Sequence, residues 1–194
     1  ATDGKKSRKI VDYGIEALKA IWHRGAVDAD GKSGDGAGIQ IEIATEFFKD
    51  KIIATGHDPD VSKRICVGMV FLPRTDYLEQ EKCREIIESI LLEENYSIYG
   101  WRQVPINSSV LGKTAEQSRP EIAQVMFKKN KNLETNDLER NLFETRKKIE
   151  KLARKNQLKN FYICSFSSRS IVYKGMFLAE MLAEFYPDLN DKKL

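Results

Sequence analysis

The chain has 194 residues, of which 41% are hydrophobic and 31% are charged, a balance typical of a globular protein with a hydrophobic core. The formal net charge of +3 is too small to indicate a nucleic-acid partner. No apolar run approaches the roughly 20 residues that a membrane-spanning helix needs, so we expect no membrane partner and a cytoplasmic location.

Elements in the first half of the chain are predicted from hydrophobic periodicity. They are a helix over 8–22, a strand over 39–43, a short helix from Thr45, a loop over 49–63, a strand over 65–72 and a helix over 76–95. We expect Ser7 to cap the first helix and Gly25 to follow its C-terminus. The run 65–72 is apolar at nearly every position, which predicts a strand covered on both faces. The core face of the helix over 76–95 is expected to include Leu78.

The second half continues the alternation of strands and helices. Its predicted elements are a strand over 97–104, a Ser-rich loop over 105–119, a strand over 122–128, a helix over 137–156, a hairpin over 161–173 that turns near 167–169, and a last helix that stops before Pro187. Trp101 and Arg102 either line a pocket or, for Trp101, pack in the core. Strands grouped between helices predict an α+β layered domain, without internal repeats or a domain linker.

The region 128–159 is rich in basic residues, with eleven Lys or Arg against five Asp or Glu. A single-stranded nucleic-acid site would need interleaved aromatic residues, and this region has only Phe143. We therefore interpret it as a solvated helix face.

The three cysteines, Cys66, Cys83 and Cys164, are widely separated, and no pair has the spacing of zinc ligands. Cys66 and Cys164 fall within apolar, strand-like runs, where buried and unreactive thiols are common. The sequence therefore predicts structural thiols in a reducing compartment, no metal site, and no nucleophile among these residues.

The stretch from His23 to Ile39 is the most unusual in composition, because five of its seventeen residues are Gly and three are Asp. Such a loop persists where the backbone takes a positive φ or closely approaches a ligand, a catalytic group or another strand. Its spacing excludes a P-loop, a dinucleotide-binding fingerprint and a calcium-binding loop. A connector with solvated carboxylates stays open as the alternative to a functional loop.

A family resemblance favours the functional interpretation. The blocks Trp22–Ala26 and Ser33–Ile39 resemble the class II glutamine amidotransferase domain of glutamate synthase. Three later blocks follow in the order of that family: Val67–Pro73, Gly100–Pro105 and Val172–Met176. The resemblance implies the four-layer α/β/β/α fold of the N-terminal-nucleophile hydrolases, with residues 1–194 forming the N-terminal part of the domain.

The resemblance implies an activity in glutamate biosynthesis and ammonia assimilation. The parent protein, an oxidoreductase, hydrolyses glutamine to glutamate and ammonia and passes the ammonia to a distant synthase site. In the family, a Cys at the start of the mature chain attacks the side-chain amide, with its own α-amine as the base. This chain begins at Ala1, so we expect a fragment without the nucleophile, inactive alone. The implied FMN and iron–sulfur cluster are expected in other domains, with no cofactor bound by this segment.

Arg24, Asp35 and Gly36 are implied by the resemblance to support the glutamine pocket, and His23 to be a structural hydrogen-bonding group. A solvated charge or a partner of the helix C-terminus is the alternative for Arg24. The alternative for the whole chain is a non-catalytic amidotransferase-like binding or scaffold module. A Cys-Gly start upstream and a His-Asn-Gly block downstream would favour the enzyme.

A partial domain is also expected to leave sheet surface uncovered. The candidates are the runs Ile65–Leu72 and Phe161–Phe166, whose apolar residues need partners on both faces. We therefore expect self-association, or binding to the remainder of the glutamate synthase chain.

Overall fold

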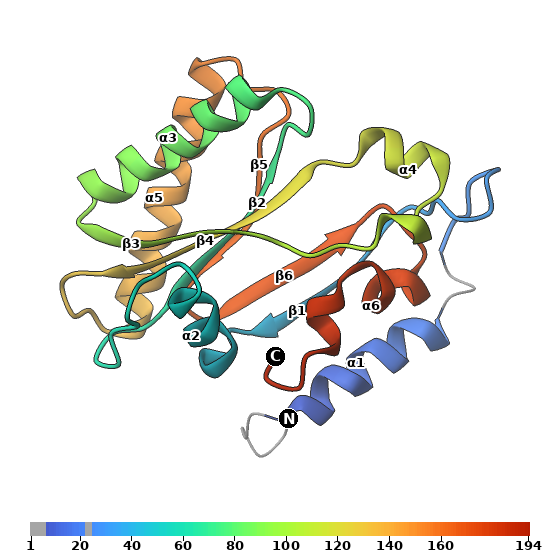
Figure 1. Ribbon diagram of the computed structural model, residues 1–194, viewed down its shortest axis with the longest axis horizontal. Helices are drawn as coiled ribbons and strands as arrows, with labels where there is room; N and C mark the ends of the chain where they lie inside the picture. The colour runs from blue at the N-terminus through green and yellow to red at the C-terminus, as the bar shows by residue number, and fades with distance from the viewer. Residues whose placement is uncertain (1–6, 22–24) are drawn as a thin grey trace. The chain divides into compact units, whose positions relative to one another are not determined.

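A computed structural model describes residues 7–21 and 25–194 (Figure 1). The chain forms two compact units. Unit 1 comprises Ala1–Ile41, Val104–Arg119 and Val172–Leu194, and unit 2 comprises Glu42–Gln103 and Pro120–Ile171. Helices and antiparallel strands are mixed along the chain, which confirms the predicted α+β class.

Unit 2 is built on a four-stranded sheet in the order β3-β4-β2-β5. Its strands are β2 (Cys66–Leu72), β3 (Tyr96–Gln103), β4 (Glu121–Lys129) and β5 (Tyr162–Ser167). Every neighbouring pair is antiparallel, and β2 is an inner strand. The predicted strand over 65–72 is confirmed, and six of the seven residues of β2 are buried.

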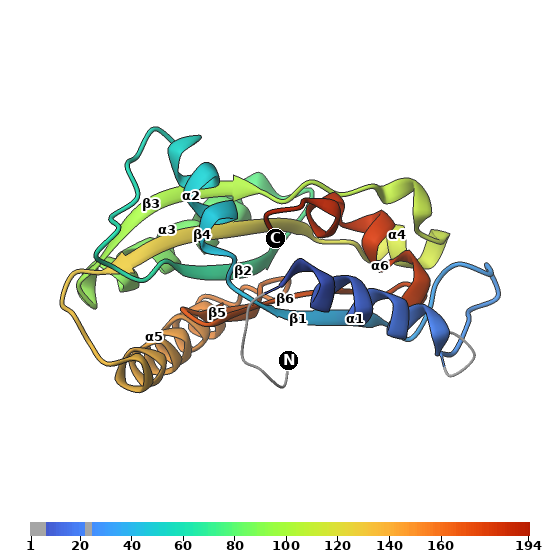
Figure 2. The ribbon, with the colours of Figure 1, turned by 90° about the horizontal axis from the view of Figure 1, so that it is seen from below.

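Two long helices pack against this sheet, α3 (Tyr77–Glu93) and α5 (Thr135–Lys155). In Figure 2, α5 lies on one side of the four strands. Alternate residues of β2 and β4 point into the core that these helices cover, including Val70, Leu72 and Val125. Gly68 leaves room for its neighbours, because a Cβ there would lie 2.8 Å from both Phe166 and Val125. A shorter helix, α2 (Thr45–Ile53), completes this unit.

Unit 1 contains the remaining helices and most of a two-stranded sheet that pairs β1 (Ala37–Glu42) with β6 (Ser170–Gly175). Its described α-helices are α1 (Arg8–Ala20), α4 (Lys113–Ser118) and α6 (Leu182–Phe185). The unit also contains the 3-10 turns η2 (Ser108–Val110), η3 (Ala179–Met181) and η4 (Pro187–Asn190). The guanidinium of Arg8 donates to the carbonyls of Asp191 and Leu189, which ties the last residues of the chain to α1.

The predicted limits of two helices need correction. The first helix ends at Ala20 with Ile21 as its C-cap, so Gly25 does not directly follow the helix. Ser7 is the N-cap residue, although its side chain makes no capping hydrogen bond. The stretch 49–63 is not entirely loop, because α2 continues to Ile53 and buries Ile52.

Leu78 was expected in the core face of α3, and this prediction is wrong. Leu78 is 86% exposed, whereas Gln80 is buried. The amide of Gln80 donates to the carbonyls of Pro73 at 2.5 Å and Arg74 at 3.3 Å. These bonds satisfy a polar group at a position where periodicity predicts an apolar one.

The predicted hairpin over 161–173 is also wrong, because β5 pairs with β2 and β6 pairs with β1 in a different sheet. The carboxylate of Glu139 on α5 holds the connection between the two strands. It accepts hydrogen bonds from the Ser167 hydroxyl at 2.8 Å and from the backbone N–H and hydroxyl of Ser168 at 2.7 and 2.6 Å. These contacts replace the turn that a hairpin would have made.

Most residues of the runs Ile65–Leu72 and Phe161–Phe166 are buried, although Tyr162 in the second run is 44% exposed. Within the first, only Gly68 lacks a side chain and Phe71 is half-buried, while Ile65 is 7% exposed. In the second, Ile163 is 1% exposed and Phe166 7%. Because β5 lies at the edge of its sheet, self-association and binding to the remainder of the glutamate synthase chain stay predictions. Among the described residues, no helix is long and apolar enough to cross a membrane.

Candidate functional site

The described part of the Gly-rich stretch forms a small hairpin. Val27 and Gly34 pair as an antiparallel bridge. The Asp28 N–H donates to Ser33 O at 2.9 Å, and the Asp35 N–H to Ala26 O at 3.3 Å. Gly31 closes the turn at a φ of +70°, a conformation that favours glycine. His23 and Arg24, two of the predicted site-region residues, lie outside the described part of the chain.

The side chain of Asp30 organises this hairpin. Its Oδ1 accepts from the backbone N–H groups of Lys32 at 3.0 Å and Ser33 at 2.7 Å, and its Oδ2 accepts from the Ser33 hydroxyl at 2.6 Å. These bonds, led by the one from the hydroxyl, hold the pKa of the Asp30 carboxyl well below its usual range. The group is therefore an anion at neutral pH.

The glycines that follow the hairpin face another part of the backbone. A Cβ on Gly38 would lie 2.9 Å from Tyr173 O, and one on Gly34 would lie 3.2 Å from Phe177 O. Gly36 has a φ of +116°, and its Cβ would lie 3.3 Å from Gly175 O. A ligand, a catalytic group or another strand was expected beside these glycines. The structure shows another strand, β6, and the segment that follows it.

Asp35 and Gly36 lie between the hairpin and β1, and both are exposed. The Asp35 carboxylate faces solvent, while its backbone is tied to the hairpin through Ala26. Gly36 lies against Gly175, so the structure brings together two of the sequence blocks that carry the family resemblance.

Trp101 belongs to the core of unit 2 and Arg102 to the sheet. The indole of Trp101 packs against the core cluster, donates to Glu88 at 2.6 Å and lies 4.6 Å below the Arg84 guanidinium. Arg102 donates to the Gln124 side chain at 2.9 Å. For Trp101, the core interpretation is the one that the structure supports.

All three cysteines are buried free thiols, as predicted for Cys66 and Cys164. Burial raises the pKa of the Cys66 thiol far above its usual range and that of Cys83 to about 12. Since the thiolate is the nucleophilic form, neither thiol is activated. Within residues 7–21 and 25–194, no three His, Cys, Asp or Glu side chains gather as a metal site would require.

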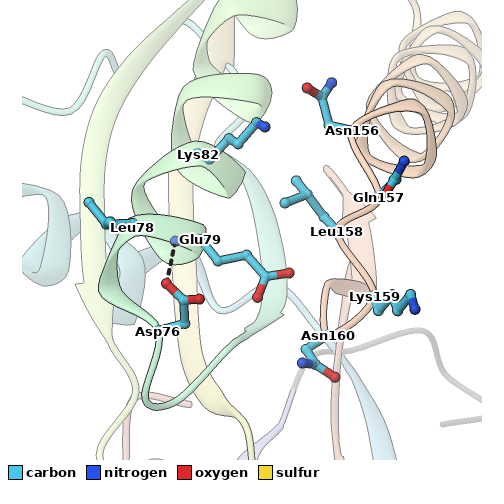
Figure 3. A pocket seen from close by; sticks show the side chains of 9 residues that line it. All are labelled: Asp76, Leu78, Glu79, Lys82, Asn156, Gln157, Leu158, Lys159 and Asn160. Atoms are coloured by element: carbon cyan, nitrogen blue, oxygen red, sulfur yellow. Dashed lines mark hydrogen bonds between the residues drawn. The ribbon is translucent and has the colours of Figure 1, made fainter.

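An open cavity of about 500 Å³ lies between the start of α3 and the end of α5. Figure 3 shows Leu158 projecting toward α3, and Asp76 accepting from the Glu79 N–H at the helix N-terminus. The Asp76 carboxylate is thus engaged in capping. The cavity includes no cysteine and no residue of the Gly-rich stretch, so it is separate from the predicted site.

The sequence interpretation missed the role of Asp30 and Ser33 and the helix α4 within the supposed loop 105–119. An Asp followed three residues later by Ser is a recognisable turn pattern. The first turn of α4, whose N–H groups donate to Asp30 and Ser33, lies about eighty residues further along the chain. No local signal connects that turn with the hairpin.

Comparison with known proteins places this arrangement in a family. The family described as glutamine amidotransferases class-II matches residues 1–194. The chain is 53% identical over 194 residues, all of its length, to the NADPH glutamate synthase large chain of Azospirillum brasilense. It is 44% identical over 186 residues to the ferredoxin-dependent glutamate synthase of Pyropia yezoensis, and 38% identical over 192 residues to that of Spinacia oleracea.

These alignments cover 94–100% of this chain but only 12–13% of the length of each relative. The family match covers residues 1–194, which include the Gly-rich hairpin, β1, β6 and both compact units. The chain therefore belongs to the class II glutamine amidotransferases and corresponds to a segment of that domain in glutamate synthases.

Proposed function

We propose that this chain is part of the glutaminase unit of a glutamate synthase, where glutamine is hydrolysed to glutamate and ammonia. The observation that carries this proposal is the 53% identity with a glutamate synthase large chain over all 194 residues. The ammonia would then serve the synthase reaction in another part of the enzyme. Glutamine and the remainder of the polypeptide are the proposed partners, in a cytoplasmic enzyme with the four-layer fold of its family.

The nucleophile of this reaction is proposed to come from outside the 194 residues. The attack forms a thioester between the Cys sulfur and the glutamine side-chain carbonyl, and ammonia leaves; water then releases glutamate. Cys66, Cys83 and Cys164 are buried, and the thiols of Cys66 and Cys83 have raised pKa values, so these residues do not suit the role.

Arg24, Asp35 and Gly36 are proposed to support the glutamine pocket. The exposed Asp35 carboxylate is available to the ammonium or amide groups of a ligand, and Gly36 gives the backbone a positive φ without a side chain in the way. FMN and the iron–sulfur cluster are proposed to bind in other domains of the enzyme, on the basis of the family resemblance.

The test uses the full-length polypeptide that carries this segment. Purified protein is incubated with glutamine, and ammonia and glutamate are measured over time. Equal release of the two products supports the proposal. If neither forms, and a glutamine-like electrophile labels no thiol, the chain is a non-catalytic binding or scaffold module, which is the alternative function.

A further inference from the structure

Helix α4 is capped by residues that lie far away in the sequence. Its N-cap residue is Gly112, which has no side chain to bond the first N–H groups of the helix. The Thr114 N–H donates instead to Asp30 Oδ2 at 3.4 Å, and the Ala115 N–H donates to Ser33 Oγ at 3.3 Å. The Gly-rich hairpin thus supplies the cap that the helix itself lacks.

Gly112 is the residue that makes this approach possible. A Cβ at position 112 would lie 2.1 Å from Asp30 Oδ2 and 2.4 Å from Ser33 Oγ, too close for either contact to persist. We call Asp30, Ser33 and Gly112 the capping cluster. In it, one carboxylate closes the hairpin turn through Oδ1 and joins the hairpin to α4 through Oδ2.

The capping cluster lies close in the chain to the proposed pocket residues. Ser33 is 4% exposed and is held by Asp30 and by the first turn of α4. Asp35 follows Ser33 by two residues, a tether that spans at most about 7 Å. The position of Asp35 is therefore limited by the contacts that hold Ser33.

We propose that the capping cluster positions the glutamine pocket: Asp30 and Ser33, held against Gly112 and α4, fix the Gly-rich hairpin so that Asp35 and Gly36 meet the substrate. This inference rests on the proposed function. Asp30 and Ser33 act through the hairpin and are positioning residues. Helix α4 takes part in this positioning through its backbone N–H groups, although it supplies no side chain to the pocket.

The structural half of the test is peptide-level hydrogen exchange on the full-length polypeptide. In Asp30→Ala and in Gly112→Ala, amide exchange should become at least tenfold faster in both 25–36 and 113–118, although each variant changes only one side of the contact. Asp28→Ala is the matched control, because Asp28 Oδ1 accepts from its neighbour Ala29 at 2.7 Å. It should leave exchange in 113–118 unchanged.

A second comparison tests whether the three residues act together. Gly112→Ala should add no further change in the background Asp30→Ala with Ser33→Ala, where the two obstructing side chains are gone. Asp30→Asn keeps an oxygen for the hairpin bonds but presents an NH₂ group to Thr114. It should release α4 while leaving the hairpin largely protected.

The functional half is the kinetics of glutamine hydrolysis. Asp30→Ala and Gly112→Ala should each lower kcat/KM for glutamine at least tenfold, mainly through a raised KM, with Asp30→Asn intermediate and Asp28→Ala close to the wild type. Unchanged kinetics in an active enzyme would overturn the positioning proposal alone. Independent exchange in the two segments would also overturn it. A wild-type polypeptide that releases no ammonia would instead overturn the proposed function.

Discussion

The ammonium of Lys128 on β4 lies 2.8 Å from Oδ2 of Asp60, and this ion pair anchors the loop that leads into β2. The backbone N–H of Asp60 also donates to the Tyr99 hydroxyl at 3.0 Å. The Lys128 bond, followed by those from Ser62, lowers the pKa of the Asp60 carboxyl well below its usual value of 3.8. The pKa of Lys128 is raised, mainly by the same bond.

The direction of these shifts predicts how stability depends on pH. A lowered folded-state pKa means that the Asp60 contribution is present above about pH 4 and is lost as the pH falls through the folded-state value. Urea unfolding between pH 6 and pH 2.5 should therefore show a steeper loss of unfolding free energy in the wild type than in Asp60→Asn. Parallel curves would mean that the ion pair contributes nothing measurable, as for many surface pairs.

Substitution of Gly68 should disturb packing in the core, whereas the matched substitution of Gly14 should not. Gly68→Ala should lower the free energy of unfolding by about 1–3 kcal/mol, because its Cβ would collide with Phe166 and Val125 inside the sheet core. Gly14→Ala, in α1, meets only the end of the Ile39 side chain at 3.1 Å. That variant should be neutral or slightly stabilising, since Ala favours helix. Equal effects in denaturant unfolding would contradict this account.

The thiols should be unreactive until the chain unfolds. Cys66, Cys83 and Cys164 are buried, and at pH 8 a thiol with a pKa of about 12, such as Cys83, is almost entirely protonated. A chromogenic disulfide reagent should therefore titrate no thiol in the native chain and three in denaturant. Rapid labelling of any one under native conditions would place that residue in an open pocket.

The 194-residue chain alone should hydrolyse no glutamine. The thiols that it contains are buried, so the proposed reaction lacks a nucleophile, a loss that typically costs several kcal/mol of barrier. The control is a variant in which all three cysteines are substituted. If this variant still releases ammonia above the buffer rate, a group other than these thiols is responsible. Such a result would require a different catalytic residue.

Asp35→Ala in the full-length polypeptide should lower glutaminase turnover at least tenfold while changing the free energy of unfolding by less than about 0.5 kcal/mol. The side chain is exposed and packs in no core, so its removal costs little stability. The same outcome is expected for Arg24→Ala on the basis of the family resemblance. A large loss of stability with unchanged turnover would assign these residues a structural role.

Local patterns predicted most of the elements but not the contacts between distant segments. The apolar run at 65–72 and the helical pattern over 76–95 placed β2 and α3 close to their observed limits, because burial leaves a signal within a few residues. Leu78 failed as a core residue because it stands five residues before Cys83, on the side of α3 away from the buried face. The position on that face belongs to Gln80, whose two carbonyl partners periodicity does not encode.

The candidate site was only partly predictable for the same reason. A Gly-rich loop indicates close approach, yet Gly34 and Gly38 approach Phe177 and Tyr173, about 140 residues away. Helix α4 escaped prediction because its cap lies on the hairpin, at Asp30 and Ser33. The part played by Asp35 stays a prediction that rests on the resemblance.

The division of unit 1 into three stretches of sequence has a consequence for synthesis on the ribosome. Strand β1 cannot pair until β6 has been made, and Val172–Leu194 is the last of the three stretches of unit 1 to appear. The strands of unit 2 are complete earlier, once β5 is available to pair with β2. Closing a loop of more than a hundred residues carries an entropic cost that pairing must overcome. The Gly-rich hairpin therefore gains the strand beside it only near the end of translation of this segment.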